Sequence, residues 1–171
     1  MLPTPQDGKR ALADADGRRK LAVMSLSGQH TVEVDAPVEQ VYAIAADLER
    51  APEWQSSLVS VDVLERDGEG RPALVETVSD AKVKTVKARL RFSYSPPSRI
   101  DTVQENGDLK ALSGHWSFEE LGGGRTRATY ALEVDPGRML GMLLRGPAVD
   151  RVRAVLVDEA AEELKARAER G

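Results

Sequence analysis

The feature that most constrains the fold is a series of alternating apolar and polar residues between positions 86 and 134, followed by a long amphipathic segment. Side chains along a strand point alternately to opposite faces, so this alternation predicts a sheet with one apolar and one polar face. The first apolar face carries Val86, Ala88, Leu90, Phe92 and Tyr94. The next two long strands carry Leu112, Gly114, Trp116 and Phe118, then Thr126, Ala128, Tyr130, Leu132 and Val134. Hairpin turns at Asn106-Gly107 and Gly122-Gly123-Gly124 predict that these strands form an antiparallel meander.

The amphipathic segment after Asp135-Pro136 predicts a helix that is interrupted at Gly146-Pro147. Its apolar stripe contains Val149, Val152, Leu156, Ala160 and Leu164. Such a stripe needs a surface that buries it, and the apolar face of the sheet provides one. We therefore predict an α+β fold in which a curved antiparallel sheet of about seven strands wraps around a long C-terminal helix.

The first half of the chain predicts the rest of this architecture. A short strand over 29–35 leads into a helix that starts at Pro37, and Pro52 interrupts the helical region, which gives two short helices after the first strand. Further strands are expected over 58–65, 73–81 and 99–104, and the inward register of strand 73–81 is undecided. Residues 1–25 are rich in charge, proline and glycine, and we expect a mobile tail ahead of one domain over 26–169.

Composition excludes several classes of protein. The chain has 171 residues, which suits one domain, and it has no cysteine, so disulfides and Cys-based zinc sites are absent. A net charge of -4 argues against nucleic acid as a partner. No stretch has the length of a transmembrane helix or the apolar core of a secretory signal, and we expect a soluble, cytoplasmic protein. Its oligomeric state is left open.

Five phrases of the sequence resemble one known superfamily. They are Val34-Asp35-Ala36-Pro37-Val38-Glu39-Gln40-Val41-Tyr42, Pro52-Glu53-Trp54, Pro97-Ser98-Arg99-Ile100, Gly114-His115-Trp116-Ser117-Phe118 and Gly123-Gly124-Arg125-Thr126. In this order they resemble the START-like superfamily, also called Bet v 1-like or SRPBCC, and its bacterial branch described as polyketide cyclase/dehydrase. The resemblance covers about residues 28–168. It implies a helix-grip fold with a hydrophobic cavity between the sheet and the C-terminal helix.

We predict that residues on the inner face and near the helix interruption bind an apolar small molecule, although each of them could instead only fill a core. These residues are Trp54, Val86, Leu90, Phe92, Tyr94, Leu112, Trp116, Phe118, Tyr130, Leu132, Met139, Met142, Leu143, Val152 and Leu156. Glu76 and Arg99 are candidate polar contacts in the cavity, with a solvated outer face as the alternative. For the basic run Lys82 to Arg91, we expect a solvated face or weak attraction to anionic lipid.

Catalytic and metal-binding patterns are weak in this sequence. His30 and His115 are its only histidines, no Gly-x-Ser-x-Gly elbow is present, and we expect no metal and no cofactor. The leading hypothesis is therefore a noncatalytic carrier or sensor of a lipid-like, isoprenoid or polyketide-like molecule. One alternative is a polyketide cyclase or dehydrase, and another is a protein-interaction module that resembles the ribosome-associated toxin group of the same superfamily.

Overall fold

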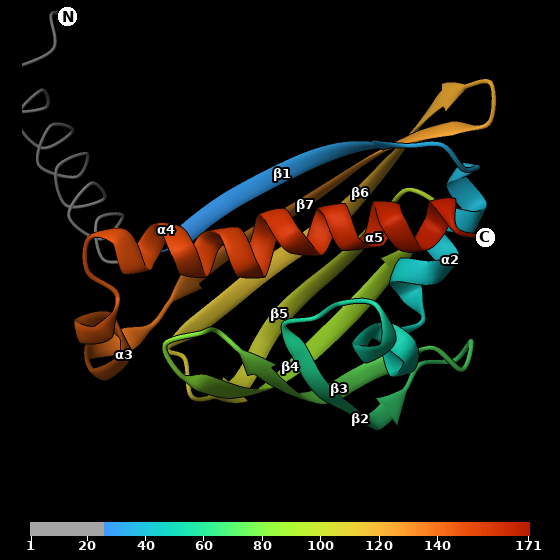
Figure 1. Ribbon diagram of the computed structural model, residues 1–171. Helices are drawn as coiled ribbons and strands as arrows, with labels where there is room; N and C mark the ends of the chain where they lie inside the picture. The colour runs from blue at the N-terminus through green and yellow to red at the C-terminus, as the bar shows by residue number, and fades with distance from the viewer. Residues whose placement is uncertain (1–25) are drawn as a thin grey trace, which may run out of the picture.

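The computed structural model describes residues 26–171, so the predicted tail over 1–25 lies outside the described residues. Within this range one antiparallel sheet holds seven strands in the order β1-β7-β6-β5-β4-β3-β2 (Figure 1). The strands are β1 (Leu26–Val34), β2 (Leu58–Arg66), β3 (Pro72–Asp80), β4 (Thr85–Ser95), β5 (Arg99–Gly107), β6 (Ala111–Gly122) and β7 (Arg125–Asp135). Every strand pairs with its neighbour in sequence except β1, which pairs with β7, and this arrangement confirms the predicted meander.

The helices lie in two groups along the chain. Between β1 and β2 come α2 (Val38–Ala46) and the 3₁₀ helix η1 (Leu48–Glu53), as predicted. After β7 come α3 (Gly137–Leu143), α4 (Pro147–Arg153), the π-helical turn η2 (Ala154–Asp158) and α5 (Glu159–Glu169). The last three form one long rod across the sheet, with α2 near its C-terminal end and α3 at the opposite end (Figure 1). The predicted helix-grip architecture is confirmed.

The interruption between α3 and α4 is at the predicted dipeptide. Gly146 has a φ of 56°, a backbone conformation that favours glycine, and Pro147 is the first residue of α4. The chain can therefore change direction between the two helices.

The predicted turn at Asn106-Gly107 lies elsewhere in the structure. Asn106 pairs with Arg89 and Gly107 with Ala88, so β5 continues through both residues. The pairing extends because Asp108 donates its N–H to the Lys87 carbonyl and accepts the Lys87 N–H on its carboxylate. The β5–β6 turn consequently follows Gly107.

Two hydrophobic clusters hold the long helix against the sheet. One gathers around α2 and α5 and includes Leu164, which has no exposed surface, while the other gathers around Val152 and Val157. Tyr130 packs against both clusters. At Gly28 of β1 an added Cβ atom would lie 2.8 Å from Cδ of Arg153, so glycine permits the close approach of the helix there.

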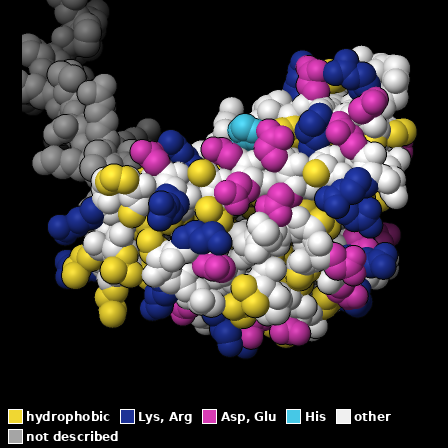
Figure 2. Space-filling view, in the orientation of Figure 1, with side chains coloured by type: hydrophobic (Ala, Val, Ile, Leu, Met, Phe, Trp, Pro, Cys, Tyr) yellow, Lys and Arg dark blue, Asp and Glu magenta, His cyan; other side chains and the backbone are white. Residues whose placement is uncertain are grey.

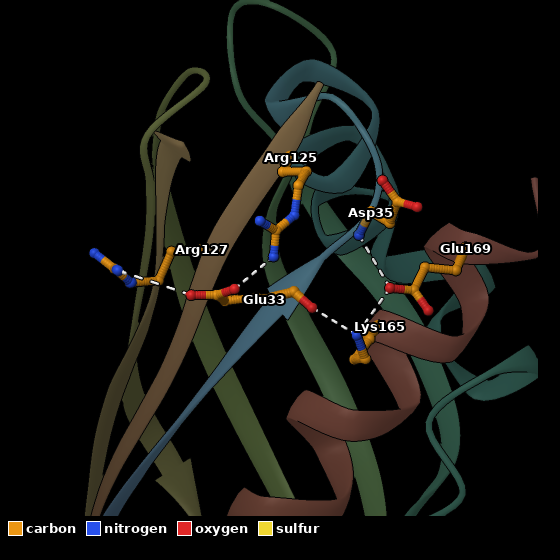
Figure 3. A network of polar contacts seen from close by, with 6 residues as sticks. All are labelled: Glu33, Asp35, Arg125, Arg127, Lys165 and Glu169. Atoms are coloured by element: carbon orange, nitrogen blue, oxygen red, sulfur yellow. Dashed lines mark hydrogen bonds and ion pairs between the residues drawn. The ribbon is translucent and has the colours of Figure 1, made fainter. Parts of the chain in front are cut away.

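Polar contacts fix the C-terminal end of the rod to β1 (Figure 3). The Lys165 ammonium donates to the Glu33 carbonyl at 2.6 Å and to the Glu169 carboxylate at 2.8 Å. Glu169 also accepts the backbone N–H of Asp35 at 3.0 Å. The hydrogen bond from Lys165 is the main reason why the pKa of Glu169 lies below its ordinary value.

Among the described residues, no helix is long and apolar enough to cross a bilayer.

Candidate ligand-binding cavity

A cavity of about 160 Å³ lies between the inner face of the sheet and the helical rod. One water molecule needs roughly 10 to 15 Å³ by the same measure, so the cavity has room for roughly 11 to 16 non-hydrogen atoms. Residues from α2, η1, all seven strands, α3, α4 and η2 line it. Members of both hydrophobic clusters line it, Trp116 from one and Leu132 from the other, so the cavity borders both parts of the core.

Aromatic side chains form one side of the cavity. Trp116 of β6 stacks on Tyr130 of β7 with ring centroids 4.4 Å apart, and Phe118, which does not line the cavity, stacks on Trp116 at 6.0 Å. Trp54, which follows η1, also lines the cavity, so both tryptophans of the chain border it. Between Leu112 and Trp116 on β6 is Gly114, where an added Cβ atom would lie 2.8 Å from the Ala131 carbonyl oxygen and 3.0 Å from a methyl carbon of Leu132, so glycine permits the close approach of β7.

The structure decides the register of the third strand, which the sequence left open. Val75 pairs with Leu90 and Thr77 with Ala88 in the β3–β4 ladder. All four line the cavity. Glu76 pairs with Arg89 and therefore points to the outer face.

A few polar groups face the cavity. Thr102 of β5 lines it, and the hydroxyl oxygen of this residue is buried without a hydrogen-bond partner among the described residues. Burial raises the pKa of Tyr130 to about 12, so its phenol stays protonated and can donate a hydrogen bond. Lys84 is the one lysine, arginine or carboxylate-bearing residue among the described residues that line the cavity. The lining therefore suits a ligand with an apolar, uncharged body.

The cavity reaches solvent at the β3–β4 turn. Val83 and Lys84 in this turn are the only exposed residues among the described ones that line the cavity. Leu109 from the β5–β6 turn and Leu144 after α3 belong to the same hydrophobic cluster as Val86. We call the opening bounded by the two turns and α3 the mouth.

Ten of the predicted ligand-binding residues line this one cavity. They are Trp54, Val86, Leu90, Phe92, Leu112, Trp116, Tyr130, Leu132, Val152 and Leu156. The structure therefore brings together predicted residues that are far apart in the sequence, from Trp54 after η1 to Leu156 in η2. Contact of each residue with a ligand stays a prediction.

The other five predicted apolar residues lie away from the cavity. Tyr94 donates its hydroxyl to the Pro72 carbonyl at 2.6 Å, under the Arg71 guanidinium, because β4 extends beyond the cavity. Phe118 is buried in the core between Trp116 and Tyr42. Met139, Met142 and Leu143 are exposed on α3, because the inward side of this helix is occupied by Leu140.

The two predicted polar contacts are corrected by the structure, because both point to the outer face. Glu76 forms ion pairs with Arg89 at 3.1 Å and Lys87 at 3.6 Å, and the Arg89 hydrogen bond lowers the pKa of this carboxyl. Arg99 pairs with Asp101 at 2.9 Å beside His115, in a shallow polar groove. Burial, then Arg99, lowers the pKa of His115, which favours its neutral form.

Sequence reasoning missed about two thirds of the lining. The missed residues are Leu26, Ala45, Leu48, Ala51, Gln55, Ser57, Leu58, Val61, Val75, Thr77, Ser79, Ala81, Val83, Lys84, Ala88, Ile100, Thr102, Leu109, His115, Val134, Pro136, Leu140 and Leu144. The alternation around Ala88 and Val134 was a usable signal for those two positions. Positions such as Thr77 and Ser79 are polar, and their inward direction follows only from the pairing of β3 with β4.

Apart from Lys84 at the exposed rim, the polar groups that line the cavity are neutral and offer hydrogen bonds. No carboxylate of the described residues lines it, so it lacks the carboxyl pair that general acid-base catalysis commonly uses. Among residues 26–171, no group of three or more His, Cys, Asp or Glu side chains has the geometry to hold a metal ion.

Comparisons with known proteins agree with this geometry. Residues 34–160 match the family described as polyketide cyclase/dehydrase and lipid transport. A curated relative, the granaticin polyketide synthase bifunctional cyclase/dehydratase of Streptomyces violaceoruber, is 33% identical over 101 residues. These residues are 57% of this chain and 31% of the relative, so the match spans about a third of that protein.

Solved structures show the same fold. A START superfamily protein from Mycobacterium smegmatis superposes with a TM-score of 0.74 at 23% identity, covering 84% of this chain and 97% of that one. A protein from Thermus thermophilus gives 0.72 at 25% identity, with 83% and 96% covered. The Zhui aromatase/cyclase from a Streptomyces species gives 0.69 at 22% identity, with 85% and 94% covered. The START-like fold predicted from the sequence phrases is confirmed.

Proposed function

The chain belongs to the polyketide cyclase/dehydrase and lipid transport family, and on that premise we propose that it binds a compact apolar small molecule in the cavity and acts as its carrier or sensor. The ligand is lipid-like, isoprenoid or polyketide-like, and the ligand-binding domain spans residues 26–169. We propose a cytoplasmic location for it. A molecule of more than roughly 16 non-hydrogen atoms would extend through the mouth.

The observation that carries this proposal is the lining of the cavity. Apolar side chains dominate, the polar groups inside are neutral, and Lys84 stands at the exposed rim. Burial of apolar surface supplies the affinity at about 25 cal/mol for each Å² removed from water. The hydroxyls of Thr102 and Tyr130 can orient a carbonyl or hydroxyl group of the ligand.

The test uses a variant that fills the cavity. Ala88 is buried on the inner face of β4, so Ala88→Phe places a ring in the cavity, whereas Ala111→Phe adds the same ring at an exposed position of β6. Both tryptophans border the cavity, so tryptophan emission reports binding of 2-naphthol, a bicyclic probe of suitable size. We expect the Ala111 variant to bind as the parent does and the Ala88 variant to lose at least tenfold in affinity, from a loss of about 1.4 kcal/mol or more.

A companion measurement identifies the natural ligand. Native mass spectrometry of the protein purified from its own host, followed by organic extraction, should find a co-purified apolar compound. Equal affinity of both phenylalanine variants for 2-naphthol would refute the cavity as the binding site.

A polyketide cyclase is the second candidate, and the two inward hydroxyls favour it. Tyr130 and Thr102 can donate hydrogen bonds to ketone oxygens, which stabilises the enolate that is left when a water molecule accepts the α-proton ahead of an aldol closure. In that case Tyr130→Phe should lower the rate of cyclisation of a poly-β-ketone at least tenfold while binding of 2-naphthol changes by less than about threefold. An unchanged cyclisation rate would exclude Tyr130 from the reaction.

A further inference from the structure

Helix α3 is apolar on its outward face as well as on its inward face. Leu140 of this helix lines the cavity. On the outward face Met139, Met142 and Leu143 are 83%, 66% and 51% exposed. Figure 2 shows apolar side chains gathered over α3, projecting from one end of the molecule. We call Met139, Met142 and Leu143 the α3 surface.

Positive charge surrounds this surface. Arg138 and Arg145 flank it in the sequence, and neither has an ion-pair partner among the described residues. Lys84 at the rim of the mouth likewise pairs with no described carboxylate. The whole chain has a net charge of -4, so the unpaired cations at this end have the opposite sign to the net charge of the protein.

We propose that the α3 surface docks on a bilayer that contains anionic lipid, which brings the mouth of the cavity to the membrane. Methionine and leucine side chains that project from a tip can enter the boundary between headgroups and acyl chains. Arginine stems can lie along that boundary while their guanidinium groups meet lipid phosphates. Docking thereby gives an apolar ligand a short path between the bilayer and the cavity without crossing water.

The size of the α3 surface favours a bilayer over a second copy or another protein. A stable protein interface needs roughly 800 Å² from each partner. Three side chains on a helix of seven residues provide much less. A few inserted apolar side chains with nearby cations are enough for reversible membrane binding, because each cation close to an anionic surface adds about fivefold in affinity.

The experiment is co-sedimentation of the full chain with vesicles. We expect binding to vesicles of equal parts phosphatidylcholine and phosphatidylglycerol, weaker binding to pure phosphatidylcholine, and a decrease at high salt. Replacing all three residues of the α3 surface by serine should reduce binding at least tenfold, because the insertion of apolar side chains is removed. The double variant Arg138→Gln and Arg145→Gln should reduce binding to the anionic vesicles by roughly 25-fold and leave binding to pure phosphatidylcholine unchanged.

The matched control is a pair of serine substitutions at Val59 of β2 and Val103 of β5, which are 58% and 50% exposed and belong neither to α3 nor to the two turns that bound the mouth. This control should sediment with vesicles as the parent does, and so should Ala88→Phe, because docking does not depend on ligand binding. Failure of 2-naphthol binding with intact docking would therefore affect only the proposed function. The inference is overturned if the parent does not bind anionic vesicles, or if the serine variant binds as well as the parent. It is also overturned if the α3 surface proves to mediate a dimer that the same variant dissociates.

Discussion

Leu164 and Leu156 lie on the same helical rod in different surroundings, which allows one substitution to test the cavity. Leu164 has no exposed surface and packs in the cluster around α2 and α5, whereas Leu156 is partly exposed and lines the cavity. Replacing either by alanine removes three carbon atoms, and both changes have the same small effect on helix propensity. The difference in unfolding free energy therefore reports the packing around each side chain.

The expected magnitudes follow from burial. At about 0.8 kcal/mol for each buried CH₂ group, Leu164→Ala loses about 2.4 kcal/mol of transfer free energy, and the new void raises the cost to about 3.5 kcal/mol. Leu156 already lacks neighbours on its cavity side, so its removal enlarges an existing void. We expect Leu156→Ala to cost about 1 to 1.5 kcal/mol, which makes the difference between the two variants about 2 kcal/mol.

Urea unfolding followed by circular dichroism measures both values, and equal slopes against urea concentration would confirm that both variants unfold in the same way as the parent. The melting temperature should fall by about 7 to 14 °C for Leu164→Ala and by about 2 to 6 °C for Leu156→Ala. If the two costs agree within about 0.5 kcal/mol, Leu156 is as tightly packed as Leu164. The cavity beneath the rod would then be absent, and the reasoning would be refuted.

Three further predictions concern single positions. The hydrogen bond from Lys165 keeps the pKa of Glu169 below its ordinary value of 4.5, so its stabilisation is present above about pH 4.5 and is lost as the pH falls through the lowered pKa of the folded state. Glu169→Gln should remove this part of the acid sensitivity in urea titrations at pH values between about 6 and 3, and an unchanged pH profile would count against it. Gly28→Ala should change the unfolding free energy by less than about 1 kcal/mol, because the Arg153 stem that its Cβ meets is flexible, while Gly28→Val should cost about 1 to 3 kcal/mol. Equal costs for the two Gly28 variants would show that the rod does not approach β1 there. Because burial raises the pKa of Tyr130 to about 12, its ultraviolet absorbance should show little ionisation at about pH 10, where a free tyrosine is half ionised, and half-ionisation near pH 10 in the folded protein would show that the ring is exposed.

Local sequence patterns were sufficient to predict which residues lie on the inner face of the long strands. Alternation in β4, β6 and β7 identified Leu90, Trp116 and Tyr130 as inward residues, because the period of two is a property of the strand itself. The same logic placed Val152 and Leu156 on the inward stripe of the helix. All five line the cavity.

The pattern was insufficient where a residue's direction depends on its neighbours. The third strand has mixed composition, and only its pairing with β4 turns Thr77 inward and Glu76 outward. For Met139 and Met142, composition could not show whether α3 turns its methionines or Leu140 toward the cavity. The mobile tail expected over 1–25 stays a prediction.

The sequence by itself determined the order of the elements, the inner face of the long strands, and the helix that covers them, because dihedral preferences and apolar periodicity act over a few residues. Only the tertiary structure decided how far the rod stands from the sheet and where the space between them opens. That distance depends on side chains brought together from distant parts of the chain, such as Gly28 against Arg153 and Trp116 against Tyr130. A cavity results from this packing, and no local pattern encodes its volume.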